Sequence, residues 1–129
     1  MTYVIDTHPL VWNLSSDDRL SPAARKALDD RSAKLVIPAM VLAEISYLYA
    51  KRRIGVTVSS VIEHVLGTEN TVFHPLNESL AEHLPASLDI HDGIIVATAI
   101  MFRDVYGDSA AVITKDRMIT KSGLVDVLW

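Results

Sequence analysis

Short apolar runs alternate along this chain with longer segments in which hydrophobic residues recur at helical spacing. The runs predict strands at residues 3–5, 34–37, 71–74, 110–113 and, less regularly patterned, 125–128. Between them, caps and periodicity predict helices that begin near Thr7 and that cover residues 21–28, 38–53, 56–66 and 77–84. Regular alternation of strand and helix indicates an α/β sandwich with a mostly parallel sheet.

The longest apolar run covers residues 94–102 and is broken only by Thr98. Periodicity alone does not separate a buried helix from a buried strand here. Ala97 and Ala99 favour a helix, Asp89 is a good N-cap, and Asp92 would then lie in the first turn, where negative charge is favoured. We therefore expect a central helix, buried nearly all round, with acidic residues at its amino end.

The helix expected at residues 38–53 has one polar residue out of place. Val41, Ile45 and Leu48 form an apolar stripe, and Glu44 falls within it at 100° per residue. A glutamate is seldom buried unless it is paired or bound to a metal. The two interpretations are a salt bridge to a nearby arginine and a place in a functional site.

Composition limits the possible classes of protein. The chain has 129 residues, half of them hydrophobic, which suits a single domain over residues 1–129. The absence of cysteine excludes disulfides, thiolate metal sites and cysteine nucleophiles, and it is compatible with the cytoplasmic location that we expect. No apolar run is long enough to span a membrane, and the first residues lack the basic start of a signal peptide. A formal net charge of −4 argues against broad electrostatic binding of nucleic acid, although a local basic patch or bound cations would still attract phosphates.

Four acidic residues invite a common explanation. Asp6 and Asp116 follow apolar strands, and the carboxyl ends of parallel strands line the ligand crevice of open sheets. Asp92, in the first turn of the central helix, and Glu44, on the inward face of the helix at residues 38–53, could meet them at the same edge. Four bare carboxylates would repel one another unless cations neutralised them. Oxygen ligands without histidine or cysteine suit Mg²⁺ or Mn²⁺, and such clusters serve two-metal phosphodiester chemistry.

Each acid also has a purely structural interpretation. Asp6 would be a turn or capping residue, Asp92 a partner of the helix dipole, and Asp89 an N-cap. Asp116 would be an ordinary loop acid. The joint pattern carries more weight than any one member.

The four acids lie in segments that resemble a known family. These are Tyr-Val-Ile-Asp-Thr-His around Asp6, Ile-Pro-Ala-Met-Val-Leu-Ala-Glu-Ile around Glu44, Asp-Ile-His-Asp-Gly-Ile-Ile-Val-Ala-Thr-Ala around Asp92 and Val-Ile-Thr-Lys-Asp ending at Asp116. In order and spacing they resemble the PIN-domain family over essentially the whole chain, and the compact form looks like a VapC-type toxin. Many relatives read Asp-Pro-x-Asp-Arg around the third acid, where this chain has Asp89-Ile-His-Asp92-Gly93. The difference leaves the acids in place and concerns local substrate contacts.

The resemblance implies a PIN-like three-layer sandwich and a metal-dependent endoribonuclease, the toxin of a toxin–antitoxin pair. It also implies a homodimer silenced by a cognate antitoxin protein. Apolar residues of the helices that start at Ser21 and Val56 could form the dimer surface or could equally be core. Catalytic and metal-ligand roles would fall on Asp6, Glu44, Asp92 and Asp116, with Thr114 as a supporting polar group and Asp89 as a further acid.

We therefore expect hydrolysis of RNA by metal-activated water with Mg²⁺ or Mn²⁺, two ions per site, leaving 5′-phosphate and 3′-hydroxyl ends. Lys115, Arg117 and the basic residues 51–53 are candidates for phosphate contact, although the latter also suit a helix C-terminus. A haloacid-dehalogenase-like phosphatase would need an aspartate at His8, and a receiver domain would leave Glu44 unexplained. The serious alternative is a non-catalytic PIN-fold binding module for a protein partner or RNA.

Overall fold

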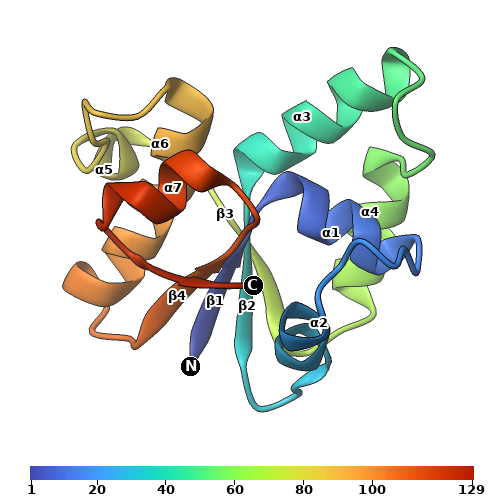
Figure 1. Ribbon diagram of the computed structural model, residues 1–129, viewed down its shortest axis with the longest axis horizontal. Helices are drawn as coiled ribbons and strands as arrows, with labels where there is room; N and C mark the ends of the chain where they lie inside the picture. Colours follow the sequence, from blue (N-terminus) through green and yellow to red (C-terminus); the bar gives the residue numbers. More distant parts are fainter.

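The computed structural model describes residues 1–129 as a five-stranded sheet with helices on both faces (Figure 1). All strand pairs are parallel, in the order β3-β2-β1-β4-β5. The strands are β1 (Thr2–Ile5), β2 (Lys34–Pro38), β3 (Thr71–His74), β4 (Ala110–Ile113) and β5 (Asp126–Leu128). The helices are α1 (Thr7–Leu14), α2 (Pro22–Asp29), α3 (Ala39–Ala50), α4 (Val58–Leu66), α5 (Glu78–Ala81), α6 (Ile90–Ile100) and α7 (Arg117–Ser122). The predicted α/β sandwich is thus confirmed, with α1 to α4 on one side of the sheet and α5 to α7 on the other.

The parallel arrangement brings the carboxyl ends of the strands to one edge of the sheet. Val4 of the central strand is in register with Val36 of β2 and Val112 of β4, and all three side chains are fully buried. Strands covered by helices on both faces are apolar throughout rather than alternating, which explains the short apolar runs in the sequence. Helices α1, α3 and α7 begin at or near this edge, directly after β1, β2 and β4.

Helix α6 is the central helix expected from the sequence. Residues 93–99 are all buried, and Asp89 is its N-cap, accepting a hydrogen bond of 2.9 Å from the Asp92 N–H. The helix continues into a π-helical turn, η1 (Met101–Val105). Since α6 packs against β1, β2 and β4, it holds the first-turn acid Asp92 at the carboxyl edge of the sheet.

Several predicted boundaries were wrong. Helix α3 ends at Ala50 rather than near Arg53, because Arg52 adopts a left-handed backbone (φ 56°) and its N–H bonds back to the Tyr49 carbonyl. The helix expected at 77–84 covers only Glu78–Ala81. Helix α7 was missed, and Asp6 rather than Thr7 is the N-cap of α1.

The apolar residues of α2 and α4 mainly pack inside the chain. Ala24 and Leu28 of α2 and Val61 of α4 belong to the core, whereas Ile62 and Leu66 of α4 stay exposed. None of the helices is both long and apolar enough to cross a lipid bilayer.

Candidate active site

Asp6 is held rigidly at the carboxyl end of the central strand. Its Oδ1 accepts a hydrogen bond of 2.7 Å from the Thr7 N–H, and its Oδ2 accepts one of 2.6 Å from Thr114 Oγ1. The first bond makes Asp6 the N-cap of α1, so its capping interpretation is correct as far as it goes. The second comes from a different strand end and fixes the rotation of the carboxylate.

Thr114 links two of the acids. Its side chain is almost completely buried, and besides donating to Asp6 its hydroxyl accepts a hydrogen bond of 3.0 Å from the Asp116 N–H. Asp116 in turn caps α7, because its Oδ1 accepts the Ile119 N–H at 2.9 Å. The adjacent positions of β1 and β4 in the sheet therefore bring Asp6 and Asp116 together through one hydroxyl group.

Asp92 lies in the electrostatic field of the other acids. Burial raises the pKa of its carboxyl to about 6 from the usual 3.8, and the negative charges of Asp116, Asp89, Asp6 and Glu44 add to this shift. Asp6, Asp116 and Asp89 stand at the starts of α1, α7 and α6, and Glu44 lies in the middle of α3. The carboxylates are therefore close enough to disfavour one another's charged form.

Glu44 faces the same edge from α3. Val41 and Ile45 of its helix are fully buried, whereas Glu44 is only half-buried, at the margin of the apolar stripe rather than inside it. Burial raises the pKa of Glu44 and the negative charge of Asp6 adds to the shift, whereas His91, a contact from the Thr7 hydroxyl and His8 oppose it. Glu44 forms no ion pair with lysine or arginine, so the expected arginine salt bridge is not present.

The donor atoms at this edge suit a hard divalent cation. They are carboxylate oxygens, and the neighbouring Thr7 Oγ1 is buried with only a long contact to the Glu44 carboxylate in place of a hydrogen bond of ordinary length. No three acidic or histidine side chains, however, are arranged so that they could hold a single ion together. The acids lie near one another and have the oxygen ligands that a divalent cation prefers. Binding of an ion would require their side chains to move closer together.

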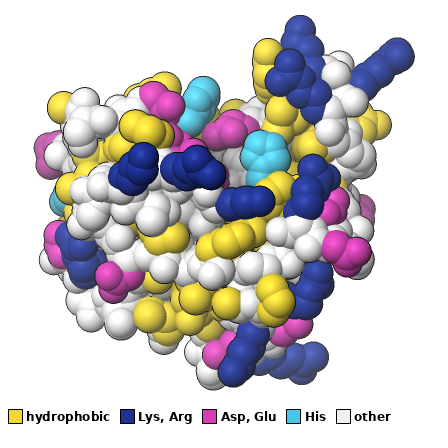
Figure 2. Space-filling view, in the orientation of Figure 1, with side chains coloured by type: hydrophobic (Ala, Val, Ile, Leu, Met, Phe, Trp, Pro, Cys, Tyr) yellow, Lys and Arg dark blue, Asp and Glu magenta, His cyan; other side chains and the backbone are white.

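Basic side chains border the acids. Lys115 and Arg117 flank Asp116 at the start of α7 and are exposed, and residues 51–53 are exposed at the far end of α3. Figure 2 shows acidic and histidine side chains in the notch beside α3, with lysine and arginine side chains around it and at the projecting end of that helix. Asp89 adds negative charge beside Asp92, but its Oδ1 is already used as the N-cap of α6.

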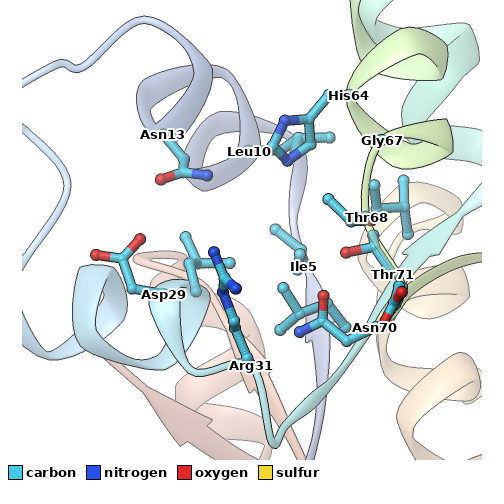
Figure 3. Close-up of a pocket in the computed structure, with 14 residues that line it drawn as sticks. Ile5, Leu10, Asn13, Asp29, Arg31, His64, Gly67, Thr68, Asn70 and Thr71 are labelled. Carbon is cyan, nitrogen blue, oxygen red and sulfur yellow. The ribbon is translucent and has the colours of Figure 1, made fainter.

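One cleft in the structure lies away from these acids. It has a volume of about 670 Å³ and lies between α1, α2 and the segment from α4 to β3, with Ile5 and Ile37 among its apolar lining and Asn13, Arg31 and His64 among its polar lining (Figure 3). None of the four acids lines it. A second cleft, of about 450 Å³, includes one of the four acids, Glu44. Its other lining residues are Met40, Ala43, Tyr47, Leu48 and His91.

The sequence analysis missed three residues at this edge, namely Thr7, Tyr47 and His91. Tyr47 carries a signal that could have been used, since it lies three positions after Glu44 and thus one helical turn along the same face. The unpartnered hydroxyl of Thr7 depends on three-dimensional packing and leaves no trace in the sequence.

Comparison with known proteins agrees with the fold. A family model described as PIN domain matches residues 3–122. One chain of the crystal structure of VapBC2 from Rickettsia felis bound to a DNA fragment from their promoter is similar in fold, with a TM-score of 0.67 and 13% sequence identity over 98% of this chain and 97% of that chain. No curated protein sequence matches. Since the family model spans nearly the whole chain, this protein belongs to the PIN domain family.

Proposed function

We propose that this protein is a metal-dependent endoribonuclease that hydrolyses RNA phosphodiester bonds. The observation that carries the proposal is the gathering of Asp6, Glu44, Asp92 and Asp116 at one sheet edge, where burial, together with the charges of the neighbouring acids, raises the pKa of Asp92 to about 6. The pKa values of Glu44 and Asp92 are both raised, and carboxyl groups held in such surroundings are typical of a functional site. Membership of the PIN family supports nuclease chemistry in particular.

Asp6, Glu44, Asp92 and Asp116 would hold Mg²⁺ or Mn²⁺, with two ions as the expected number. When bound, the metal supplies a Lewis acid for the phosphate and lowers the pKa of a water molecule. The chain itself orients the ligands. Thr114 fixes the carboxylate of Asp6 and the backbone of Asp116, and the core helix α6 fixes the backbone of Asp92.

Other residues would position the substrate. Lys115 and Arg117 are exposed beside Asp116, where their charges would offset the repulsion between the acids and an incoming phosphate. Asp89 would act mainly as the cap that sets the first turn of α6. Attack by water requires no 2′-hydroxyl, so the products would carry 5′-phosphate and 3′-hydroxyl ends.

We further propose that the chain is a VapC-type toxin that is inhibited by a cognate antitoxin and acts as a homodimer in the cytoplasm. The support is the similarity of fold to a chain of a VapBC2 complex, together with the compact single-domain form. Light scattering on the purified chain tests the dimer, and a monomer at high concentration would remove that part of the proposal.

The second candidate is a binding module that keeps the PIN fold without catalysis. What favours it is that no three acids are arranged to hold an ion in the structure. Incubation of a mixed RNA with the protein in Mn²⁺ and in EDTA separates the two. Cleavage in Mn²⁺ that EDTA abolishes supports the nuclease, whereas RNA binding without cleavage in either condition supports the binding module.

A further inference from the structure

The cleft of about 450 Å³ beside Glu44 differs in character from the acidic edge that it adjoins. It lies between one face of α3 and His91 in the first turn of α6, and most of its lining is carbon. Its volume is in the range of pockets that hold small organic groups. Glu44 belongs to both the cleft and the acid cluster, so a group in the cleft would lie next to whatever the acids bind.

Tyr47 presents the main aromatic surface of the cleft. Its side chain is 57% exposed and lies one helical turn from the half-buried Glu44, so its ring is open to a ligand in the cleft. The Lys51 ammonium lies over the ring, with its Nζ 5.6 Å from the ring centroid. Lys51 forms no ion pair with a carboxylate, so its charge is available to an anion.

The order of groups along this face of α3 matches the order of groups along a nucleic acid strand. Glu44, Tyr47 and Lys51 lie at positions i, i+3 and i+7, which places them along one side of the helix over about 10 Å. The acid end suits a phosphate held through cations, the ring suits a base, and the ammonium suits the next phosphate. Exposed aromatic rings interleaved with cations are the common device for binding single strands.

We propose that this cleft is a base-binding subsite for single-stranded RNA, in which the ring of Tyr47 stacks on an unpaired base and Lys51 contacts an adjacent phosphate. The proposal rests on the proposed function and adds to it two residues of this chain that would hold the strand beside the acids. A cleft of six residues is small against the roughly 20 to 30 residues per side of a stable protein interface, which favours a base over a second copy of the chain.

The test uses fluorescence anisotropy of a labelled single-stranded RNA in EDTA, where no cleavage is expected. Stacking on one ring typically accounts for a fivefold to hundredfold difference in affinity, so Tyr47→Ala should weaken binding by about tenfold and Tyr47→Phe by less than about threefold. Tyr49→Ala is the matched control, because Tyr49 is 50% exposed on the same helix and does not line the cleft. A fully paired RNA should bind wild type and Tyr47→Ala equally.

A second readout is photocrosslinking of the same RNA carrying 5-iodouridine, which should attach to Tyr47. Equal effects of Tyr47→Ala and Tyr49→Ala on RNA binding would overturn the subsite. It would also be overturned if Tyr47→Ala changed the mass of the protein in light scattering but left RNA binding unchanged, because the cleft would then be a contact between copies of the chain. If the wild-type chain cleaves RNA but Tyr47→Ala does so equally well, only the subsite is wrong. If the wild-type chain neither binds nor cleaves RNA, the proposed function fails as well.

Discussion

At the scale of single residues, Thr114 is the residue on which the geometry of the acids depends most. Its buried hydroxyl is the only group that bonds to both Asp6 and Asp116. We predict that Thr114→Val, which keeps the shape but removes the hydroxyl, lowers stability by about 1–2 kcal/mol, because the partly buried Asp116 N–H and the Asp6 carboxylate each lose a partner. RNA cleavage should fall by about tenfold or more, since Asp6 loses its orientation. Thr114→Ser should retain both properties; denaturant unfolding and cleavage rates measure them, and a valine variant with normal cleavage would contradict the role.

Asp92 gives the metal-free protein a distinctive pH dependence. Its pKa is raised in the fold from 3.8 to about 6, so between these values the folded chain binds more protons than the unfolded chain. Stability therefore falls as the pH rises through this window, the reverse of the usual behaviour of a salt-bridged aspartate. We predict that Asp92→Asn removes much of this fall and, in EDTA near pH 7, is more stable than wild type by about 1 kcal/mol after allowance for solvent screening. Urea unfolding at about pH 4.5 and pH 7 measures this, and a destabilised variant at pH 7 would show that Asp92 is not strained by its neighbours.

At the scale of elements, Asp116 allows a capping role to be separated from a functional one. Asparagine caps helices as well as aspartate does, whereas alanine does not. We predict that Asp116→Asn keeps the stability of the wild-type chain and loses RNA cleavage. Asp116→Ala should lose cleavage and also about 1 kcal/mol of stability, because the start of α7 loses its cap. Thermal unfolding and a cleavage assay on the two variants check this. An active Asp116→Asn chain would return the residue to a purely structural role.

The sequence predicted these elements unevenly, for identifiable physical reasons. The strands were found almost to the residue because burial on both faces makes them continuously apolar, as in β4. Helix α7 was missed because it has only six residues and one fully buried side chain, Ile119, too little for periodicity to register. The end of α3 was misplaced because Arg52, which is not a glycine, takes the left-handed conformation that ends the helix.

At the scale of the whole molecule, the sheet explains why four acids far apart in sequence could be predicted to meet. Parallel strands place every strand end at one edge, so Asp6 and the segment that follows β4 are neighbours once β1 and β4 pair. The hydrogen bonds of Thr114 and the cleft beside Tyr47 depend on side-chain packing across elements, which periodicity does not report. The sequence thus predicted that these acids lie at one edge of the sheet, the structure adds how Asp6 and Asp116 are held, and their role in a site stays a prediction.

A metal that draws the acids together should stabilise the whole fold. Binding to the folded state at about a hundred times the dissociation constant contributes roughly 2.7 kcal/mol, so millimolar Mn²⁺ should raise the thermal midpoint by about 5 °C or more. The rise should be much smaller in Asp6→Asn. It should be unchanged in Glu63→Gln, a matched control whose exposed side chain on α4 is outside the acid cluster. An identical midpoint with and without Mn²⁺ would favour the binding module.

The most direct test of the account is the cleavage of a single-stranded RNA in Mn²⁺ by Asp6→Asn, Glu44→Gln, Asp92→Asn and Asp116→Asn, beside Glu63→Gln, with the product ends mapped. The account predicts that wild type and Glu63→Gln leave 5′-phosphates and 3′-hydroxyls and that each of the four site variants is slower by about a hundredfold or more. Cleavage that survives in the four variants, or products that end in cyclic phosphates, would contradict it.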